Sequence, residues 1–300
     1  MTHKILVTGA GGFVGKHLVA KLEKKGYTVS QSVYSPTTDL TDFAYTERLI
    51  QETKPDVVYQ LAALSVVEGS ERNAPQILTA NSVLQYNILE AVRLHAPGTR
   101  IVAICSANGY GLVAAVDTPI KETCPQRPLN PYAVSKVTQE LLAQEYYLAY
   151  NMDIVILRPF NHTGPGQTPN FVIPALAKQF VSAERGEISE IVVGNTATIR
   201  DFTDVEDMVD AYILAGEKCK SGEVYNIGSG HGVSIHDVIE LFRKVTKIDI
   251  PIRIDVGNQR TADVPILVAD NSKFVAATGW TPTIPLDKTI INVLDFWRKQ

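Results

Sequence analysis

Cysteine is scarce in this sequence. The 300-residue chain has three cysteines, Cys105, Cys124 and Cys219, which are odd in number and far apart. A disulfide framework needs paired cysteines, and a structural metal site needs ligands at short, regular spacing. The pattern excludes both, so we expect reduced thiols and no metal.

Long apolar runs are also lacking. The first apolar run, residues 5–7, is followed at once by a glycine-rich segment. It is too short for the core of a secretion signal or for a membrane span. We therefore expect a cytoplasmic protein with no membrane partner.

No charge of either sign dominates. The chain has 28 basic and 32 acidic residues, a formal net charge of −4, and no long run of like charges. This excludes the basic footprint that nucleic-acid binding requires, so we expect no nucleic-acid partner. With 45% hydrophobic residues, the chain can bury a large core.

Four nearly continuous apolar runs are present, at residues 4–8, 56–60, 100–105 and 153–158. Such runs are typical of parallel strands covered on both faces, and amphipathic helical stretches lie between them. The alternation predicts the α/β fold class, a Rossmann-type doubly wound parallel sheet that binds ligands at the carboxyl ends of its strands.

The character of the chain changes after Arg158. Prolines and glycines crowd residues 159–174, where we expect loops and no regular element. Asp204 and Ser234 each precede a helical stretch and have an Asp three residues later, a capping pattern. We predict a first domain at 1–160 with a returning segment near 204–230, and a smaller, interleaved α/β lobe at 161–203 and 231–300.

A glycine-rich loop, residues 8–15, follows the first strand and opens a helix that runs to about residue 25. A dinucleotide pyrophosphate needs a tight turn, close backbone and a helix N-terminus. An ordinary glycine-rich turn is the alternative. We predict that this loop binds the cofactor through Gly9, Gly12, Phe13, Val14 and Gly15.

The second strand has no acidic residue at its end, in the segment 28–34. NAD-binding sites usually place an acid there to bind the ribose hydroxyls. Nothing would repel a 2′-phosphate, and Ser32 could bond to it, although no arginine is present. NADP(H) is therefore favoured over NAD(H). Asp39 and Leu40 are candidates for the adenine edge, or Asp39 is simply a turn residue.

Tyr132 and Lys136 lie one turn apart on a helical stretch that ends near residue 150. A tyrosine pKa is near ~10, so acid/base work at neutral pH needs a cation such as Lys136 nearby. An ordinary surface pair is the alternative. Ser106 ends the strand 100–105 at the same carboxyl edge, where its hydroxyl could steady a carbonyl or alkoxide.

The chain resembles the extended short-chain dehydrogenase/reductases over essentially its whole length. The shared features, in family order, are the glycine loop, Leu61-Ala62-Ala63 after a strand, the segment 106–111, Tyr132 and Lys136. The resemblance implies that Ser106 binds the substrate oxygen, Tyr132 exchanges its proton, and Lys136 holds the nicotinamide ribose and lowers the tyrosine pKa. It also places Leu61, Ala62, Ala63 and Pro159 at the cofactor.

Three further segments, 158–167, 200–205 and 259–265, resemble the GDP-mannose 4,6-dehydratase and GDP-6-deoxy-4-ketohexose reductase branch. The resemblance implies a diphosphate-binding role for Arg200 and Arg260, although either could instead pair with Asp201 or Asp263. Guanidinium groups suit phosphate oxygens. The further substrate-binding candidates that the resemblance implies are Ser65, Asn108, Asn161, Val172 and Asp263. It also implies a helix-to-sheet hydrogen bond at Asn81. His162 is left without a catalytic role.

Asn108 departs from the dehydratase pattern. Relatives assign removal of the C5 proton to an acid two positions after the catalytic Ser or Thr, and an amide cannot exchange protons at neutral pH. Some reductases of the branch keep an acid there as well.

We therefore predict a homodimeric, NADPH-dependent enzyme that reduces the C4 ketone of a GDP-4-keto-6-deoxyhexose to a GDP-6-deoxyhexose of the GDP-rhamnose type. The alternatives are an NAD-dependent nucleotide-sugar 4-epimerase, a 4,6-dehydratase, which Asn108 disfavours, and a cofactor-binding sensor or scaffold.

Overall fold

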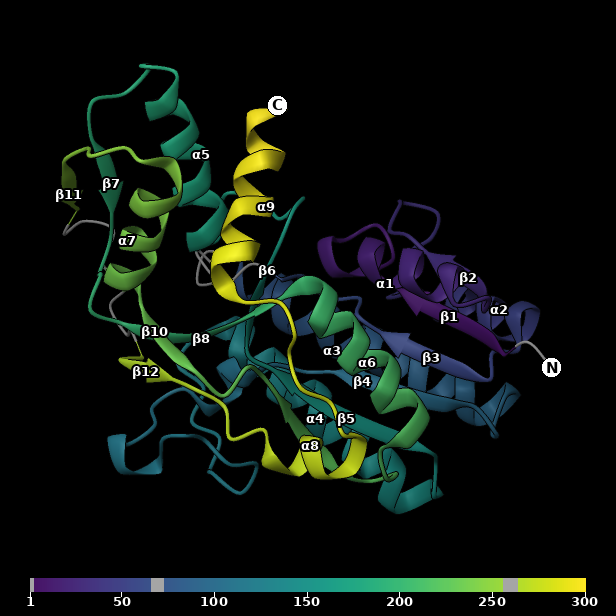
Figure 1. Cartoon of the computed structure of the whole chain (residues 1–300). Coiled ribbons are helices and arrows are strands. Elements are labelled where there is room, and N and C mark those ends of the chain that lie inside the picture. The colour runs from purple at the N-terminus through teal and green to yellow at the C-terminus, as the bar shows by residue number, and fades with distance from the viewer. Residues whose placement is uncertain (1–2, 66–72, 256–263) are drawn as a thin grey trace.

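The computed structural model describes residues 3–65, 73–255 and 264–300, and strands alternate with helices through the first half of the chain (Figure 1). In order, these elements are β1 (Lys4–Thr8), α1 (Phe13–Lys24), β2 (Thr28–Ser32), α2 (Phe43–Thr53), β3 (Val57–Gln60), α3 (Ala74–His95), β4 (Arg100–Ile104), η1 (Ala107–Tyr110), η2 (Ala115–Asp117), α4 (Pro131–Tyr150) and β5 (Ile154–Pro159).

A parallel sheet of six strands forms the centre of the first lobe, in the order β2-β1-β3-β4-β5-β9. Its last strand, β9 (Val224–Ile227), comes from much later in the chain and pairs with β5. The order reverses between β1 and β3, which is where ligands bind in such sheets. The predicted fold class is confirmed.

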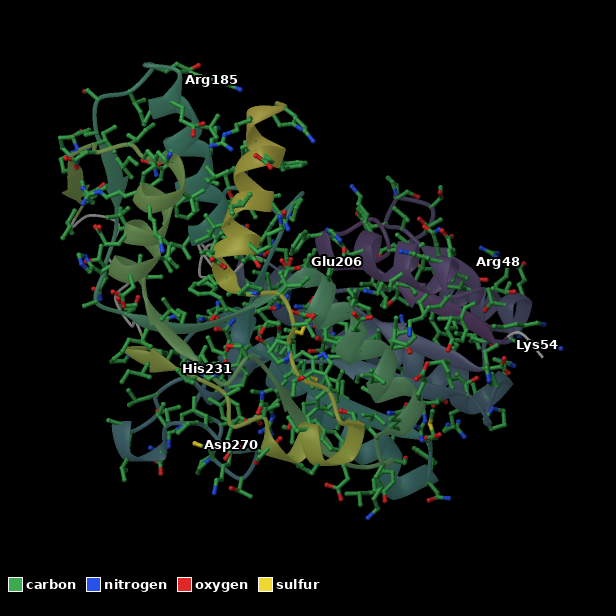
Figure 2. All side chains as sticks on the ribbon, viewed as in Figure 1. Arg48, Lys54, Arg185, Glu206, His231 and Asp270 are labelled. Atoms are coloured by element: carbon green, nitrogen blue, oxygen red, sulfur yellow. The ribbon has the colours of Figure 1, made fainter. Side chains whose placement is uncertain are left out.

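Both faces of the sheet are covered. Ile5 and Val7 of β1 pack with α1 and α6 (Val205–Lys218) on one face, while Leu6 packs with α2, α3 and α4 on the other. Because helices cover both faces of the sheet, its central strands need the continuous apolar sequence that identified them. Charged side chains such as Arg48, Lys54 and Arg185 project from the outer rims of the molecule (Figure 2).

The second lobe is built around β8 (Ile199–Asp204), which pairs with β6 (Asn161–Thr163), β10 (Gly232–Ser234) and β12 (Ile266–Leu267). A second, two-stranded sheet joins β7 (Ile191–Val193) to β11 (Ile252–Ile254). The helices α5 (Val172–Glu184), α7 (Ile235–Thr246) and α9 (Leu286–Arg298) pack together around Phe180 and Phe242, whose rings stack with centroids 5.1 Å apart. The remaining helix, α8 (Ser272–Thr278), lies against β9 and α6 of the first lobe.

The expectation that residues 159–174 contain no regular element is wrong. β6 lies within this segment and pairs with β8, and α5 begins at Val172. Pro174 sits in the first turn of α5, where a helix tolerates proline because the missing N–H would have no acceptor within the helix.

The helix starts predicted at Asp204 and Ser234 are confirmed. Asp204 Oδ1 accepts a hydrogen bond from the Glu206 N–H at 2.8 Å, and Ser234 Oγ accepts one from the Asp237 N–H at 3.0 Å. Asp207 instead accepts bonds from Thr283 and Ile284, far away in the sequence.

The three cysteines are free thiols. Among the helices within the described ranges, none is both long and apolar enough to cross a bilayer. In the same part of the chain, no group of three or more His, Cys, Asp or Glu side chains is placed to hold a metal ion.

Candidate active site

A cavity of about 720 Å³ opens at the carboxyl ends of the parallel strands. The glycine loop, the ends of β2 to β5 and the start of α4 all contribute to its wall. Each residue predicted to bind the cofactor lines it: Gly9, Gly12, Phe13, Val14, Gly15, Ser32, Asp39, Leu40, Leu61, Ala62, Ala63, Tyr132, Lys136 and Pro159. Residues from six separate segments are thus brought to one place.

The glycine loop turns tightly at Gly9, whose φ of +71° favours glycine. A Cβ on Gly15 would overlap the Gly9 carbonyl oxygen, so this glycine lets α1 pack onto the turn. Gly12 precedes α1 as its N-cap residue and makes no side-chain cap. The N–H groups of the first turn of α1 are therefore available to an anion, as a dinucleotide pyrophosphate requires.

Hydroxyl groups line the cavity beyond the end of β2. Ser32 is buried there, and Thr38 lies close by in the lining. Asp39 Oδ1 accepts a hydrogen bond from the Thr41 N–H at 2.9 Å, as a turn aspartate does. Of the lysines and arginines in the described ranges, Lys136 alone lines the cavity.

Ser106 and the start of α4 bring three polar side chains together. Ser106 follows β4 and caps η1, with its Oγ accepting from the Asn108 N–H at 3.2 Å. Asn130 caps α4 through a 2.8 Å bond from the Ala133 N–H, and this start turns Tyr132 and Lys136 inward, 8% and 4% exposed. The predicted catalytic residues therefore share one buried corner of the cavity.

Burial sets the protonation of this corner. Burial raises the pKa of Tyr132 to about 12, and the hydrogen bond with Ser106 acts in the opposite direction. Burial also lowers the pKa of Lys136 to about 8, and its ammonium group donates to the Ile104 carbonyl at 2.9 Å. At neutral pH Tyr132 is protonated and able to deliver a proton to a forming alkoxide.

A buried ion pair, which the sequence did not reveal, lies behind this corner. Arg158 Nη2 and Nε contact the two carboxylate oxygens of Glu140 at 2.5 and 2.9 Å. Glu140 is one helical turn beyond Lys136 on α4, and Arg158 is next to Pro159 on β5. The one feature of the sequence that pointed to this ion pair is the four-residue spacing of positions 132, 136 and 140. This spacing puts the acid at position 140 on the same buried face of the helix as Tyr132 and Lys136.

The same guanidinium reaches the segment after Ser106. Arg158 Nη1 donates to the Tyr110 hydroxyl at 2.7 Å, and this hydroxyl donates to Asn226 Oδ1 at 2.6 Å. The network therefore joins η1, α4, β5 and β9, which fixes Ser106 relative to Tyr132. We call Arg158, Glu140, Tyr110 and Asn226 the inner cluster.

Asn81 ties the loop after β3 to α4. Its Oδ1 accepts from the Leu64 N–H at 2.7 Å, and its Nδ2 donates to Ser135 Oγ at 2.9 Å. Helix α3 thus holds both the loop after β3, which lines the cavity, and α4.

The substrate-binding candidates are spread more widely. Ser65, Asn108 and Asn161 line the cavity, and Asn161 Oδ1 is buried without a hydrogen-bond partner among the described residues. Val172 begins α5 beside Phe171, which lines the cavity. His162, to which the sequence assigned no catalysis, lines it too.

Arg200 is on β8, outside the described lining, and its Nη1 donates to the Ile199 carbonyl at 2.9 Å. Arg260 and Asp263 lie outside the described residues. Asp201 is buried and accepts from the N–H groups of Ser229, Gly230 and Ala269, so it anchors the turn after β9.

Comparisons with known proteins agree with this geometry. Residues 31–293 match the family described as GDP-mannose 4,6 dehydratase. The chain is 32% identical, over its full length and 99% of the relative, to GDP-6-deoxy-D-mannose reductase of Pseudomonas aeruginosa.

Two solved structures are similar over nearly the whole chain. One is RMD from Pseudomonas aeruginosa complexed with NADPH, with a TM-score of 0.91 and 31% identity over 99% of both chains. The other is the UDP-glucose 4-epimerase of Thermus thermophilus in complex with NAD, with a TM-score of 0.87 and 27% identity over 98% of both chains.

Proposed function

Because the chain belongs to the GDP-mannose 4,6-dehydratase family, and so to the extended short-chain dehydrogenase/reductases that modify nucleotide sugars, we propose that it reduces the C4 ketone of a GDP-4-keto-6-deoxyhexose. It is an NAD(P)-dependent oxidoreductase. The observation that carries the proposed reaction is Asn108, an amide in the cavity wall two residues after Ser106, where a dehydratase needs an acid. Ketone reduction needs no such acid.

NADPH, when bound, would supply the hydride for C4. Tyr132 would donate its proton to the C4 oxygen, and the Ser106 hydroxyl would hydrogen-bond that oxygen. Lys136 would hold the nicotinamide ribose beside Tyr132. These groups are already ordered by the caps of η1 and α4, so little reorganisation opposes the reaction.

We assign cofactor binding to residues 1–160 with the returning segment near 204–230, and nucleotide-sugar binding to 161–203 and 231–300. The unpartnered, buried Asn161 Oδ1 supports a substrate contact, because a buried acceptor is destabilising until it is bonded. In this proposal Ser65 contacts sugar hydroxyls, and Arg200 and Arg260 bind the diphosphate. Val172 and Asp263 contact other parts of the nucleotide sugar.

NADPH is the proposed cofactor. The end of β2 bears the Ser32 hydroxyl and no acid, which suits a 2′-phosphate, and the similar structure from P. aeruginosa is complexed with NADPH. Comparing kcat/KM for NADPH and NADH checks the preference.

Two copies of the chain are proposed to pair through α3 and α4. These helices expose several large apolar side chains: Tyr86, Leu94, Leu141, Leu148 and Tyr150. Sedimentation equilibrium would give the mass of a dimer.

The test of the reaction is NADPH oxidation with GDP-4-keto-6-deoxymannose, generated in place by a separate dehydratase, with identification of the sugar product. Tyr132→Phe should lower kcat about 100-fold or more while NADPH affinity changes little, because only the proton donor is lost. Tyr45→Phe, on α2 and outside the cavity lining, is the matched control. Equal loss of kcat and cofactor affinity in Tyr132→Phe would exclude the proton-donor role.

A 4-epimerase is the second candidate, because the same three residues serve it and an epimerase in complex with NAD has the same fold. Such an enzyme would purify with NAD that is released only on denaturation, and it would not consume NADPH.

A further inference from the structure

His162 lies on β6 between Asn161 and Thr163 and lines the cavity. Its Nδ1 is 3.0 Å from the Phe160 carbonyl oxygen. Its ring lies parallel to that of Phe13 in the glycine loop, with an interplanar angle of 5° and centroids 6.4 Å apart. The histidine therefore connects the phosphate-binding loop to the strand that carries Asn161.

The hydrogen bond at Nδ1 determines what the other nitrogen can do. A carbonyl oxygen only accepts, so Nδ1 must carry a proton. Burial lowers the pKa of His162, which favours the neutral ring, although the bond to Phe160 opposes this shift. In a neutral ring protonated at Nδ1, Nε2 is a hydrogen-bond acceptor, and it has no bonding partner in the part of the chain that the structure describes.

The surroundings hold the backbone of His162 and the ring that stacks on it in place. Gln167 Nε2 donates to the His162 carbonyl at 3.1 Å, and Thr163 Oγ1 donates to Gln167 Oε1 at 2.8 Å. Phe13 is itself packed edge-on against His17, with ring centroids 5.4 Å apart. The acceptor therefore has a fixed position at the cavity, which is what selective recognition requires.

We propose that His162 Nε2 is a specificity-determining acceptor that takes a hydrogen bond from a sugar hydroxyl, on either the hexose of the substrate or the nicotinamide ribose. The hexose source rests on the proposed function, and the ribose source does not. In either case the bond would align the ligand between the glycine loop and the corner formed by Ser106 and Tyr132.

Three substitutions separate the possible roles of the ring. Glutamine places an oxygen where Nε2 was, so His162→Gln keeps an acceptor at that position. Asparagine places a donor near Nδ1, so His162→Asn keeps the bond to Phe160. Phenylalanine keeps the ring that stacks on Phe13. His236→Gln, on the exposed surface of α7, is the matched control.

Each variant is titrated with NADPH alone and with GDP-mannose alone by calorimetry, assayed for ketone reduction, and melted to check folding. We expect His162→Asn and His162→Phe to lose about tenfold or more in affinity or in kcat/KM, because one hydrogen bond to the ligand is lost. His162→Gln should stay within about threefold of the natural protein, and melting temperatures should change little.

A different ranking of the three variants by affinity or kcat/KM overturns the proposal. If His162→Asn kept the most affinity and activity, His162 would only anchor β6 through its bond to Phe160. If His162→Phe kept the most, the ring would only pack against Phe13. Equal behaviour of all three variants would also refute it. The NADPH titration identifies ribose as the source, and GDP-mannose binding or KM identifies the hexose. If the natural protein reduces no ketone, the proposed function fails, while both binding titrations still decide the role of His162.

Discussion

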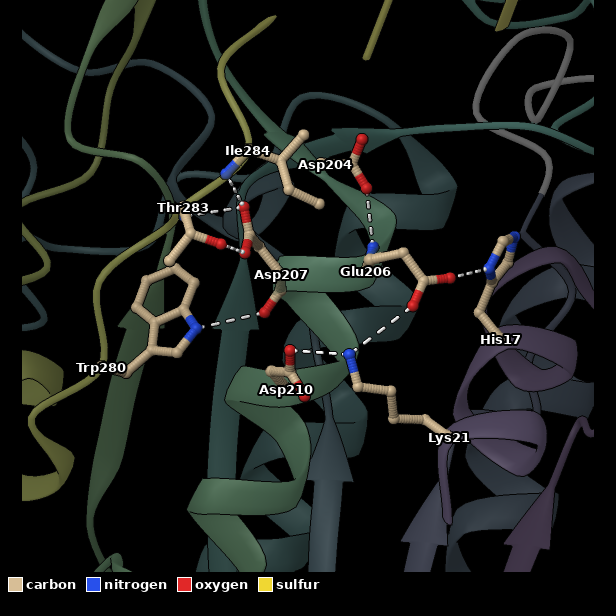
Figure 3. Close-up of polar contacts among 9 residues, drawn as sticks. All are labelled: His17, Lys21, Asp204, Glu206, Asp207, Asp210, Trp280, Thr283 and Ile284. Carbon is tan, nitrogen blue, oxygen red and sulfur yellow. Dashed lines mark hydrogen bonds and ion pairs between the residues drawn. The ribbon is translucent and has the colours of Figure 1, made fainter. Parts of the chain in front are cut away.

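Two clusters of polar and charged residues join segments that are distant in the sequence, and they differ in their contact with water. In the inner cluster, the side chains of Arg158 and Glu140 are 7% and 2% exposed. The outer cluster consists of His17 and Lys21 on α1 with Glu206 and Asp210 on α6 (Figure 3). There, Lys21 is 26% exposed and Glu206 is 42% exposed.

The difference in exposure changes what each cluster contributes to the stability and the arrangement of the fold. A buried charge whose partner is removed cannot be rehydrated, so such a pair defines one arrangement of its segments. A half-exposed pair exchanges protein contacts for water at little loss and is screened by salt. The inner cluster therefore fixes the corner formed by Ser106 and Tyr132, while the outer cluster adds modestly to the packing of α1 on α6.

Removing the inner cation should have the largest effect. Arg158→Met leaves the buried Glu140 without its cation, so we expect a loss of about 3–5 kcal/mol in the free energy of unfolding. Urea denaturation measures it. The double variant Arg158→Met with Glu140→Leu should regain part of the loss, because no unpaired charge remains. A loss below about 1 kcal/mol in the single variant would show that the inner cluster is not the stronger of the two.

Lys136 is a third case, a buried cation that is bonded to a backbone carbonyl rather than to a carboxylate. It therefore isolates the cost of burying a charge without a charged partner. Burial lowers its pKa from 10.5 to about 8. Between these values the unfolded chain binds more protons than the folded one, so the stability of the natural protein rises with pH over this window.

Lys136→Met lacks this cost of burying a charge. Without cofactor it should be about 1–3 kcal/mol more stable than the natural protein at pH 7, and its advantage should shrink as pH rises from 8 to 10. Urea unfolding at pH 7 and pH 10 tests this. A variant that is less stable at pH 7, or whose difference does not vary with pH, would contradict the shifted pKa.

Loss of the outer cation should have the smallest effect. Lys21 Nζ lies 2.8 Å from Asp210 Oδ2 and 3.7 Å from Glu206 Oε2. Lys21→Ala should lower the free energy of unfolding by no more than about 1 kcal/mol, and less in 1 M salt. Lys24→Ala, exposed on the same helix, is the control. A loss as large as that of Arg158→Met would remove the distinction between the clusters.

Local patterns in the sequence predicted the parts of the molecule that local chemistry dictates. Continuous apolar runs identified β1, β3, β4 and β5 to within two residues, and glycine spacing identified the loop before α1. The four-residue gap between Tyr132 and Lys136 put both on one face of α4. These features depend on neighbours in the sequence, so the sequence displays them.

Side-chain contacts between distant segments had no such signal. Asp207 accepts bonds from the N–H groups of Thr283 and Ile284 and from Thr283 Oγ1, while the Trp280 indole donates to its carbonyl (Figure 3). In the sequence it looked like half of a capping pattern. Arg158 looked like the polar end of an apolar strand, because its partner Glu140 is separated from it by the end of α4 and the start of β5.

The place of β9 in the sheet has a consequence for synthesis of the chain. All six residues of β5 are buried, yet the strand that covers its outer edge is made only after β6, α5, β7, β8 and α6. At about 5–20 residues per second, a nascent chain therefore carries an open, apolar β-edge for several seconds on the ribosome. The six-stranded sheet, although most of it comes first in the sequence, is completed only after β6, α5, β7 and β8 of the second lobe have been translated.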